Sequence, residues 1–302
     1  MTARRIIAIA ITLAMLSACN LWEKTSPDKI FERVIAQYNS MQTYKDKGTI
    51  TTDINTGAMK MTIETSFSIL LKKPNLYLIS WTQKNMLMPG MVHSGAVWSN
   101  GTQPYLYMGI FNAYSKMGND QLALGGATGI SSGAAFTIPS LFLTVFNEPP
   151  TLFSRLKDAK MEKTEKIGED DCYVISGSSA ISKKETFWIS KKSYLIKKYL
   201  RSLEPPEGGH QMPEIKDEHI EETIKGMGLE VTEERKKNMR ENMEKSAEML
   251  KTLKMEGSST EVHTDISSPE LHKNDFNADL PEGAVLKKSL FGRAFNGSMW
   301  MK

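Results

Sequence analysis

The first periodic segment of the chain predicts an amphipathic helix of about four turns over residues 26–41. Ser26 is a typical N-cap, Pro27 suits the first helical position, and Asp28 is favourable in the first turn. Apolar residues recur at spacings of three and four and therefore share one face of the helix. They are Ile30, Phe31, Val34, Ile35, Tyr38 and Met41. Such a face needs a partner surface to cover it.

From Tyr44 onward the apolar positions recur at every second residue, which predicts β-strands. A half-buried strand of unusual length is predicted over 59–71, where apolar and polar residues alternate. Turn residues follow it and lead into a strand over 76–81. Two further strands, over 92–98 and 103–108, make a hairpin. The N-terminal half is therefore predicted to be a helix followed by a meander of adjacent antiparallel strands.

The middle of the chain has a different composition. Residues 122–136 are rich in Gly, Ala and Ser and predict a flexible loop. The apolar run 138–146 follows it, and Pro139 favours a short helix there, because proline suits a helix N-terminus and interrupts a central strand. Strands are predicted to resume over 172–176, 185–190 and 194–203, with a final long strand over 260–266.

Residues 204–261 stand apart in charge. They hold 15 acidic and 9 basic residues, a net charge of −6. Within them Met239, Met243, Ala247 and Leu250 keep helical spacing beside Glu and Lys, which predicts a charged helix with one narrow apolar stripe. A solvated insertion docked on the sheet is the simpler interpretation. A partner-binding arm is the alternative.

Composition narrows the class of protein. The chain has 302 residues, 40% of them hydrophobic and 24% charged, with two cysteines. This content excludes wholesale disorder, a collagen-like repeat, a polytopic membrane protein and a disulfide scaffold. The length suits one large domain or two small ones.

The N-terminus reads as an export signal. Arg4 and Arg5 form a basic region, and residues 6–15 supply an apolar run that is too short for a comfortable membrane span. The string Leu16-Ser17-Ala18-Cys19 resembles the lipobox of bacterial lipoproteins. This resemblance implies cleavage before Cys19, a diacylglyceryl group on its thiol and attachment to a membrane. Asn20 then implies an outer-membrane destination, by the sorting rules of such lipoproteins, if the host has two membranes.

Two further consequences concern charge and thiols. Without Arg4 and Arg5 the mature chain keeps 36 basic and 35 acidic residues, so nucleic-acid binding is not expected. Once Cys19 is lipidated, Cys172 has no partner for a disulfide. We interpret Cys172 as a small buried residue on a strand rather than a reactive thiol.

Candidate chemistry is sparse, and we predict no catalytic residue, no metal site and no cofactor. The segment Gly129-Ile130-Ser131-Ser132-Gly133 matches a nucleophile-elbow pattern, which would make Ser131 the nucleophile of a hydrolase. That chemistry needs a buried strand immediately before the serine, and the residues before it do not predict one. The segment also lacks the Gly-Lys-Ser/Thr ending of a phosphate-binding loop, and the five histidines form no i, i+4 pair.

Apolar residues from several predicted elements would meet beneath a curved sheet. Mixed Met, Leu and aromatic side chains adapt to irregular apolar ligands. An ordinary close-packed core and a ligand cavity give the same burial pattern, so both remain open. The candidate lining consists of Met61, Ile63, Phe67, Ile69, Trp81, Leu141, Phe142 and Val145.

The order of elements and several short stretches resemble the bacterial lipoprotein-carrier fold of the LolA/LolB-like family. The stretches include 72–77, 99–101, 172–177 and 187–198, and a closing segment at 275–284. The resemblance implies an α+β fold: an incomplete, half-open antiparallel β-barrel whose concave side, partly lidded by helices, accepts acyl chains. The charged insertion is not part of the family's basic pattern. The protruding apolar loop of the family's receptor members also has no aligned counterpart in this sequence.

The expected organisation follows from these segments. It comprises a signal peptide at 1–18, a lipidated tether at 19–25, a half-barrel at 26–203 and 258–302, and a charged helical insertion at 204–257. The leading hypothesis is a non-enzymatic outer-membrane lipoprotein that binds acyl chains of lipids or lipoproteins. An envelope-stress sensor or scaffold that binds a partner protein is the alternative, and a serine hydrolase is the third possibility.

Overall fold

The computed structural model describes residues 25–57, 59–85, 92–146, 151–204, 216–227, 229–252 and 256–290. The predicted signal peptide, Cys19 and all but the last residue of the tether lie outside these residues. Among the described helices, none combines the length and the apolar character needed to cross a membrane.

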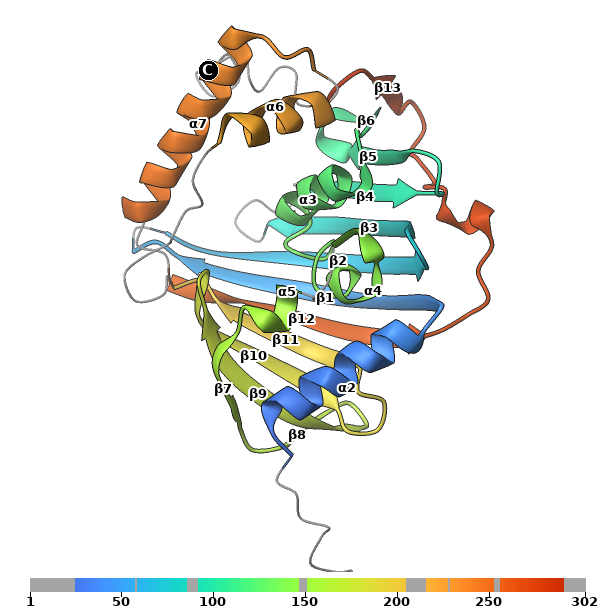
Figure 1. The fold of residues 1–302 in the computed structure, drawn as a ribbon, viewed down its shortest axis with the longest axis vertical. Coiled ribbons are helices and arrows are strands. Elements are labelled where there is room, and N and C mark those ends of the chain that lie inside the picture. The colour runs from blue at the N-terminus through green and yellow to red at the C-terminus, as the bar shows by residue number, and fades with distance from the viewer. Residues whose placement is uncertain are drawn as a thin grey trace, which may run out of the picture.

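The described strands form one open sheet (Figure 1). Its order is β13-β6-β5-β4-β3-β2-β1-β12-β11-β10-β9-β7, and β8 pairs with β9. All pairs are antiparallel except β13 with β6. The strands are β1 (Thr43–Asn55), β2 (Lys60–Lys72), β3 (Leu76–Asn85), β4 (Val92–Ser99), β5 (Pro104–Met108), β6 (Ala113–Lys116), β7 (Lys157–Met161), β8 (Glu165–Ile167), β9 (Asp170–Ser179), β10 (Ser182–Ser190), β11 (Ile196–Ser202), β12 (Glu256–Ser267) and β13 (Val285–Lys287). The sheet does not close on itself, so the expected incomplete α+β barrel is confirmed.

The predicted N-terminal helix is confirmed as α2 (Pro27–Ser40). The Ser26 side chain accepts a hydrogen bond from the Lys29 backbone N–H, and Pro27 begins the helix as expected. Its apolar face is buried through Ile30, Phe31, Val34 and Tyr38. The Phe31 ring stacks on Phe153 at 4.3 Å between centroids and lies 6.2 Å from the Phe187 ring of β10, so this helix helps to cover that part of the sheet.

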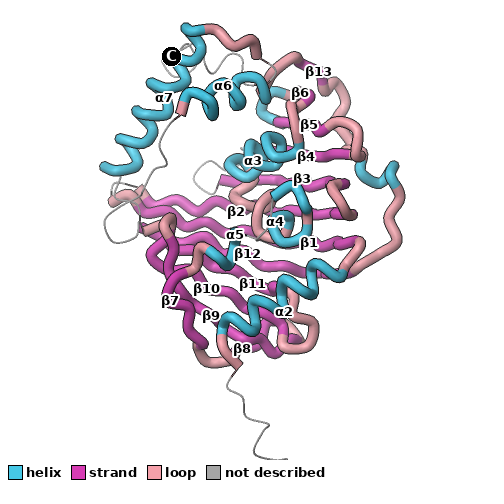
Figure 2. Tube along the Cα trace, viewed as in Figure 1, coloured by secondary structure: helices cyan, strands magenta, loops and turns pink. Residues whose placement is uncertain are grey.

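Short helices cover the same face of the sheet as α2, as Figure 2 shows; we call this the inner face. They are α3 (Asp120–Ile130), α4 (Pro139–Phe142) and α5 (Thr151–Ser154), with the 3-10 turn η3 (Thr144–Phe146) after α4. Two further 3-10 turns are η2 (Gly109–Phe111) between β5 and β6, and η4 (Lys273–Phe276) between β12 and β13. The predicted short helix at 138–146 is confirmed, with Pro139 at its first position. The flexible loop expected over 122–136 is wrong: residues 120–130 are helical, and Ala123, Leu124 and Ala127 are buried. The helix therefore packs on the core through these three residues, although the Gly- and Ala-rich composition suggested an unstructured loop.

In one row of residues across the sheet, large aromatic rings lie over glycines of the neighbouring strands. In register across β12, β1, β2, β3 and β4 lie His263, Gly48, Phe67, Trp81 and Gly95. A Cβ atom on Gly48 would lie 2.2 Å from the Phe67 ring, and one on Gly95 would lie 2.3 Å from the Trp81 ring. Each ring therefore lies over a glycine on the neighbouring strand, where any larger residue would collide with it.

The charged insertion contains α6 (Asp217–Gly226) and α7 (Glu233–Thr252), which confirms the predicted charged helix. Ile220, Ile224 and Met239 are buried together in a small core of their own. Asp217 pairs with Arg240, and Lys236 bonds Glu221 at 3.1 Å, so ion pairs also join the two helices. We call these two helices the arm.

Deleting the arm is expected to leave the sheet folded. Strands β11 and β12 are antiparallel neighbours, and the Leu203 N–H donates to the Gly257 carbonyl at 3.0 Å, so the ends of the insertion already meet. Replacing residues 205–255 by an Asn-Gly turn should change the free energy of unfolding of the sheet by less than about 1 kcal/mol. Urea denaturation of both chains, followed by tryptophan fluorescence, measures it. Collapse of the transition would show that the arm supports the sheet.

Candidate functional site

A cavity of about 320 Å³ opens on the inner face of the sheet. Strands β1, β2, β11 and β12 form its floor, and the segment from the end of α3 to Thr137 forms part of its wall. The lining residues are Thr52, Ile63, Thr128, Gly129, Ser132, Gly133, Phe136, Thr137, Arg155, Tyr199, Arg201, Ser259 and Glu261. The lining is mixed: charged and hydroxyl side chains stand beside Ile63 and Phe136. This volume lies at the lower end of the range of small-molecule sites.

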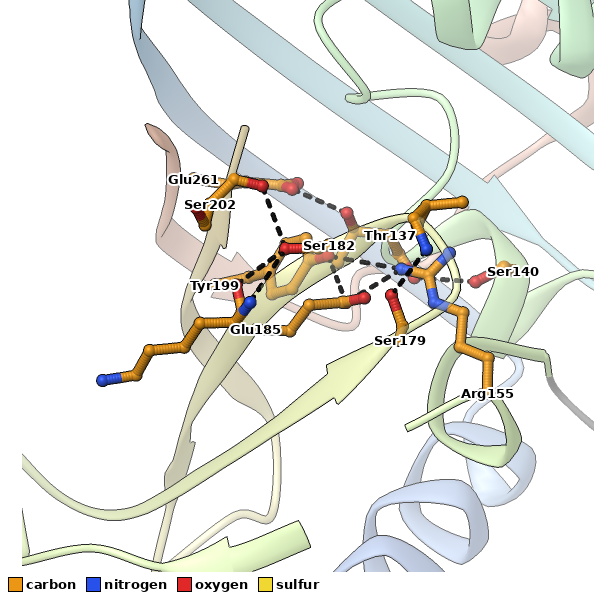
Figure 3. Close-up of polar contacts among 11 residues, drawn as sticks. Thr137, Ser140, Arg155, Ser179, Ser182, Glu185, Tyr199, Ser202 and Glu261 are labelled. Atoms are coloured by element: carbon orange, nitrogen blue, oxygen red, sulfur yellow. Dashed lines mark hydrogen bonds and ion pairs between the residues drawn. The ribbon is translucent and has the colours of Figure 1, made fainter. Parts of the chain in front are cut away.

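One polar group at the wall of the cavity centres on Arg155 (Figure 3). Its Nη2 donates to Glu185 Oε2 at 3.0 Å and to Tyr199 Oη at 3.2 Å, and the Tyr199 hydroxyl donates to the same carboxylate oxygen at 2.5 Å. The Glu185 side chain is fully buried, so this carboxylate depends on its two partners for stability. Burial raises the pKa of Tyr199, which keeps its hydroxyl protonated and able to donate.

A second polar group lies deeper, between β1 and β12. Asp46 Oδ2 contacts His263 Nδ1 at 2.7 Å and accepts the Tyr44 hydroxyl at 2.9 Å. On the other side of the ring, His263 Nε2 lies 3.2 Å from Glu261 Oε1, and Glu261 Oε2 accepts the Thr137 hydroxyl at 2.6 Å. The chain of contacts therefore runs from the sheet to the segment that covers it.

The charge state of His263 follows from these neighbours. Burial disfavours the charged ring, but the contacts with Asp46 and Glu261 outweigh burial and raise the pKa of His263 from its ordinary 6.5 to about 10. The ring is therefore an imidazolium at neutral pH, held between two carboxylates. The sequence around His263 gave no sign of a catalytic role, and no such role is needed to explain its contacts.

The raised pKa of His263 predicts a loss of stability at alkaline pH. Because its folded pKa of about 10 exceeds the unfolded value of 6.5, its contribution is full below pH 6.5 and is lost as the pH rises towards 10. Urea denaturation between pH 6 and 10 should show a steeper decline for the wild-type chain than for His263→Gln. Parallel declines would mean that the ring is neutral in the folded protein.

Hydrogen bonds attach the segment from the end of α3 to Thr137, which we call the covering segment, to the sheet. Ser132 Oγ accepts Gln83 Nε2 at 2.9 Å and lies 2.9 Å from Thr65 Oγ1. Ser132 has φ +58°, a left-handed conformation that costs energy for a residue other than glycine. Together with the Thr137 bond to Glu261, these contacts attach the segment on both sides of the cavity.

Ser131 does not occupy a nucleophile elbow. It ends the helix α3, whereas the elbow needs a strand before the serine. The residue is fully buried, and its Oγ accepts the Ala135 backbone N–H at 3.2 Å. The hydroxyl therefore stabilises a turn. Among the described residues, no cluster of three or more His, Cys, Asp or Glu side chains is arranged to hold a metal ion.

The candidate lining residues occupy two regions. Ile63 lines the cavity. Phe67, Ile69, Trp81, Leu141 and Phe142 are buried in the main core, and Val145 packs against that core. Met61 on β2 is half-buried. The structure thus brings most of these residues together in a core that is filled by protein side chains.

Sequence reasoning missed the charged residues of the site. Asp46 alternates with Tyr44 on β1, Glu185 with Phe187 on β10, and Glu261 with His263 on β12, all at inward positions. A charged residue in phase with buried neighbours is the signal that marks such a position. Cys172 behaves as interpreted: it is buried, and burial raises the pKa of its thiol to about 11.

The chain matches no protein-family model and no curated protein. It is similar to solved structures at low identity. A LolA superfamily protein from Nitrosomonas europaea shares 9% identity over 84% of this chain and 98% of that chain, with a TM-score of 0.30. The lipoprotein LppX from Mycobacterium tuberculosis shares 10% over 80% and 95%, with a TM-score of 0.39. The MucA/MucB complex from Pseudomonas aeruginosa matches with 8% identity over 82% and 59%, with a TM-score of 0.33.

These similarities concern the fold alone, and neither a ligand nor a partner of this chain follows from them. In fold, the chain is similar to LolA superfamily proteins and to bacterial lipoproteins, as the resemblance in its sequence implied.

Proposed function

We propose that this chain is a lipid-anchored protein of the bacterial envelope that binds acyl chains between its sheet and the helices that cover it. The supporting observation is the way the inner face is covered. The sheet does not close, and the short helices α3, α4 and α5 cover the core with buried residues that are mostly apolar, such as Leu124, Leu141 and Leu152. A cavity lies beside this cover.

Binding would be driven by non-directional apolar contact. Burying hydrocarbon is favourable by about 25 cal/mol per Å². Movement of the segment 122–146 would exchange contacts such as that between Phe142 and Tyr44, whose ring centroids lie 6.1 Å apart, for contacts with an acyl chain. The hydrogen bonds of Ser132 and Thr137 attach the segment to the sheet, so an acyl chain that displaces it must contribute enough apolar contact to offset their loss.

Native mass spectrometry of delipidated protein with a fatty acid or a lipopeptide tests acyl binding. The wild-type chain should retain one ligand. Ile63→Asp, which puts a charge on the cavity wall, should reduce the retained fraction at least tenfold, while Ser66→Asp on the exposed side of the same strand should not. Absence of any retained ligand in the wild-type chain would reject acyl binding.

The anchor is tested separately. We propose that Cys19 carries the diacylglyceryl group and that the protein faces the periplasm from the outer membrane. Cys19→Ser should move the protein from the membrane fraction to the soluble envelope fraction. A variant that stays with the membrane would contradict this attachment.

A protein partner is the second candidate function, and the arm supports it. Helices α6 and α7 have their own small core and present many charged side chains. In the sensor or scaffold hypothesis, replacing residues 205–255 by a turn would abolish binding of an envelope partner. In the carrier hypothesis the same chain keeps its acyl ligand.

A further inference from the structure

We propose that the cavity on the inner face binds the carboxylate of a single-chain anionic amphiphile, with Arg201 as the principal cation. This inference rests on the proposed acyl binding and specifies the class of ligand. It places the polar end of the ligand among the hydroxyl and guanidinium groups of the cavity and the chain beside Ile63 and Phe136.

The carboxylates around the cavity already have partners. Glu185 accepts Arg155 and Tyr199, Glu261 accepts Thr137 and lies beside His263, and Asp46 accepts Tyr44. Arg201 lies in register with Glu185 across β10 and β11 but makes no ion pair or hydrogen bond with any described residue. A half-buried guanidinium in this position is available for an anion, and a carboxylate matches its geometry in a bidentate pair.

Further donors lie around the same space. The Nε of Arg155 is buried and has no hydrogen-bond partner. Thr52 Oγ1 and Ser259 Oγ share one hydrogen bond of 3.1 Å, so one of the two hydroxyl hydrogens remains free to donate. Ser259 is directly opposite Arg201 in the pairing of β11 with β12. A carboxylate near Arg201 could therefore accept a hydroxyl as well.

The volume and the apolar residues limit the rest of the ligand. About 320 Å³ suits one chain rather than the several chains of a complete phospholipid or a triacylated protein. Ile63 on β2 and Phe136 in the covering segment supply apolar walls, and the Phe136 ring already lies 5.4 Å from the Arg155 guanidinium. A single acyl chain with a carboxylate matches both the apolar residues and the hydrogen-bond donors of the cavity.

Comparing dodecanoate with 1-dodecanol tests the head group, because the two share a chain length and differ in charge. Isothermal titration calorimetry with the delipidated full chain should give a Kd about tenfold lower for dodecanoate. Arg201→Gln should remove that preference by raising the Kd of dodecanoate to about that of dodecanol. Lys163→Gln, at an exposed site between β7 and β8, is the charge-matched control and should keep the preference.

A second pair of variants tests the same head-group assignment at a position outside the strands. A Cβ atom on Gly129 meets no atom within 4 Å, so side chains fit there at the edge of the cavity. Gly129→Asp should weaken dodecanoate at least fivefold more than Gly129→Asn does, because only the former repels an anion. Equal Kd values for acid and alcohol in the wild-type chain would overturn the head-group assignment while acyl binding stands. Binding of neither would overturn both.

Discussion

Gly48→Ala is expected to destabilise the protein by about 3 kcal/mol, among the largest effects of a single methyl group in this chain. The added Cβ would lie 2.2 Å from the Phe67 ring and 2.3 Å from the Val262 carbonyl oxygen. The ring could turn away, but the carbonyl belongs to the paired strand β12 and moves only with the sheet. Urea denaturation should report the loss as a lower midpoint with an unchanged slope.

Two glycines serve as controls for the collision at Gly48. Gly129→Ala, with no atom within 4 Å of the new Cβ, should be neutral or slightly stabilising. At Gly95 the three nearest atoms all belong to the Trp81 ring. Trp81→Leu should therefore rescue part of the loss caused by Gly95→Ala, whereas Phe67→Leu should rescue Gly48→Ala less. Equal rescue at both positions would mean that the Val262 backbone yields.

Asp46→Ala is expected to cost about 3–5 kcal/mol, the range for removing one partner of a buried ion pair. His263 Nδ1 and the Tyr44 hydroxyl would lose their shared acceptor at a place where no water reaches them. The free energy of unfolding at pH 7 from urea denaturation measures the effect. The pKa of His263 should also fall, because a raising contact is removed while burial persists.

A double substitution distinguishes the loss of the interaction from the cost of leaving a buried charge without its partner. Asp46→Leu with His263→Leu removes both partners and leaves apolar groups, so the double variant should lose less stability than the sum of the two single variants. Asp46→Asn keeps an acceptor oxygen and should cost less than Asp46→Ala. Additive losses in the double variant would show that the two side chains are not coupled.

Local patterns predicted the elements that have a strong period or a clear cap. The helix at 26–41 follows from Ser26, Pro27 and the apolar spacing, and the long strand at 59–71 follows from alternation, which the structure places at Lys60–Lys72. The prediction failed at 122–136, where Gly and Ala suggested looseness although the segment packs on the core. The short strands β6, β7, β8 and β13 were also missed, because three to five residues carry too little pattern.

The candidate site was predicted less completely than the fold. Ile63 lines the cavity, but Phe67 and Ile69 on the same strand lie in the filled core. Arg155, Arg201 and Glu261 come from different elements, and no spacing in the chain relates them. The cavity is also more polar than the apolar ligand cavity that the candidate lining suggested. Strand pairing brings charged residues at inward positions together there.

The amino-acid sequence alone determined the secondary-structure elements with strong periods and the meander order, because burial of one face repeats with the period of each element. It also determined that the charged stretch after β11 contains a helix, because Met239 and Met243 keep helical spacing among Glu and Lys. Tertiary structure alone decided that Asp46, Glu261 and His263 meet, that Arg201 borders a cavity, and that rings lie over Gly48 and Gly95. These relations join residues up to 217 positions apart, and strand pairing brings them into contact.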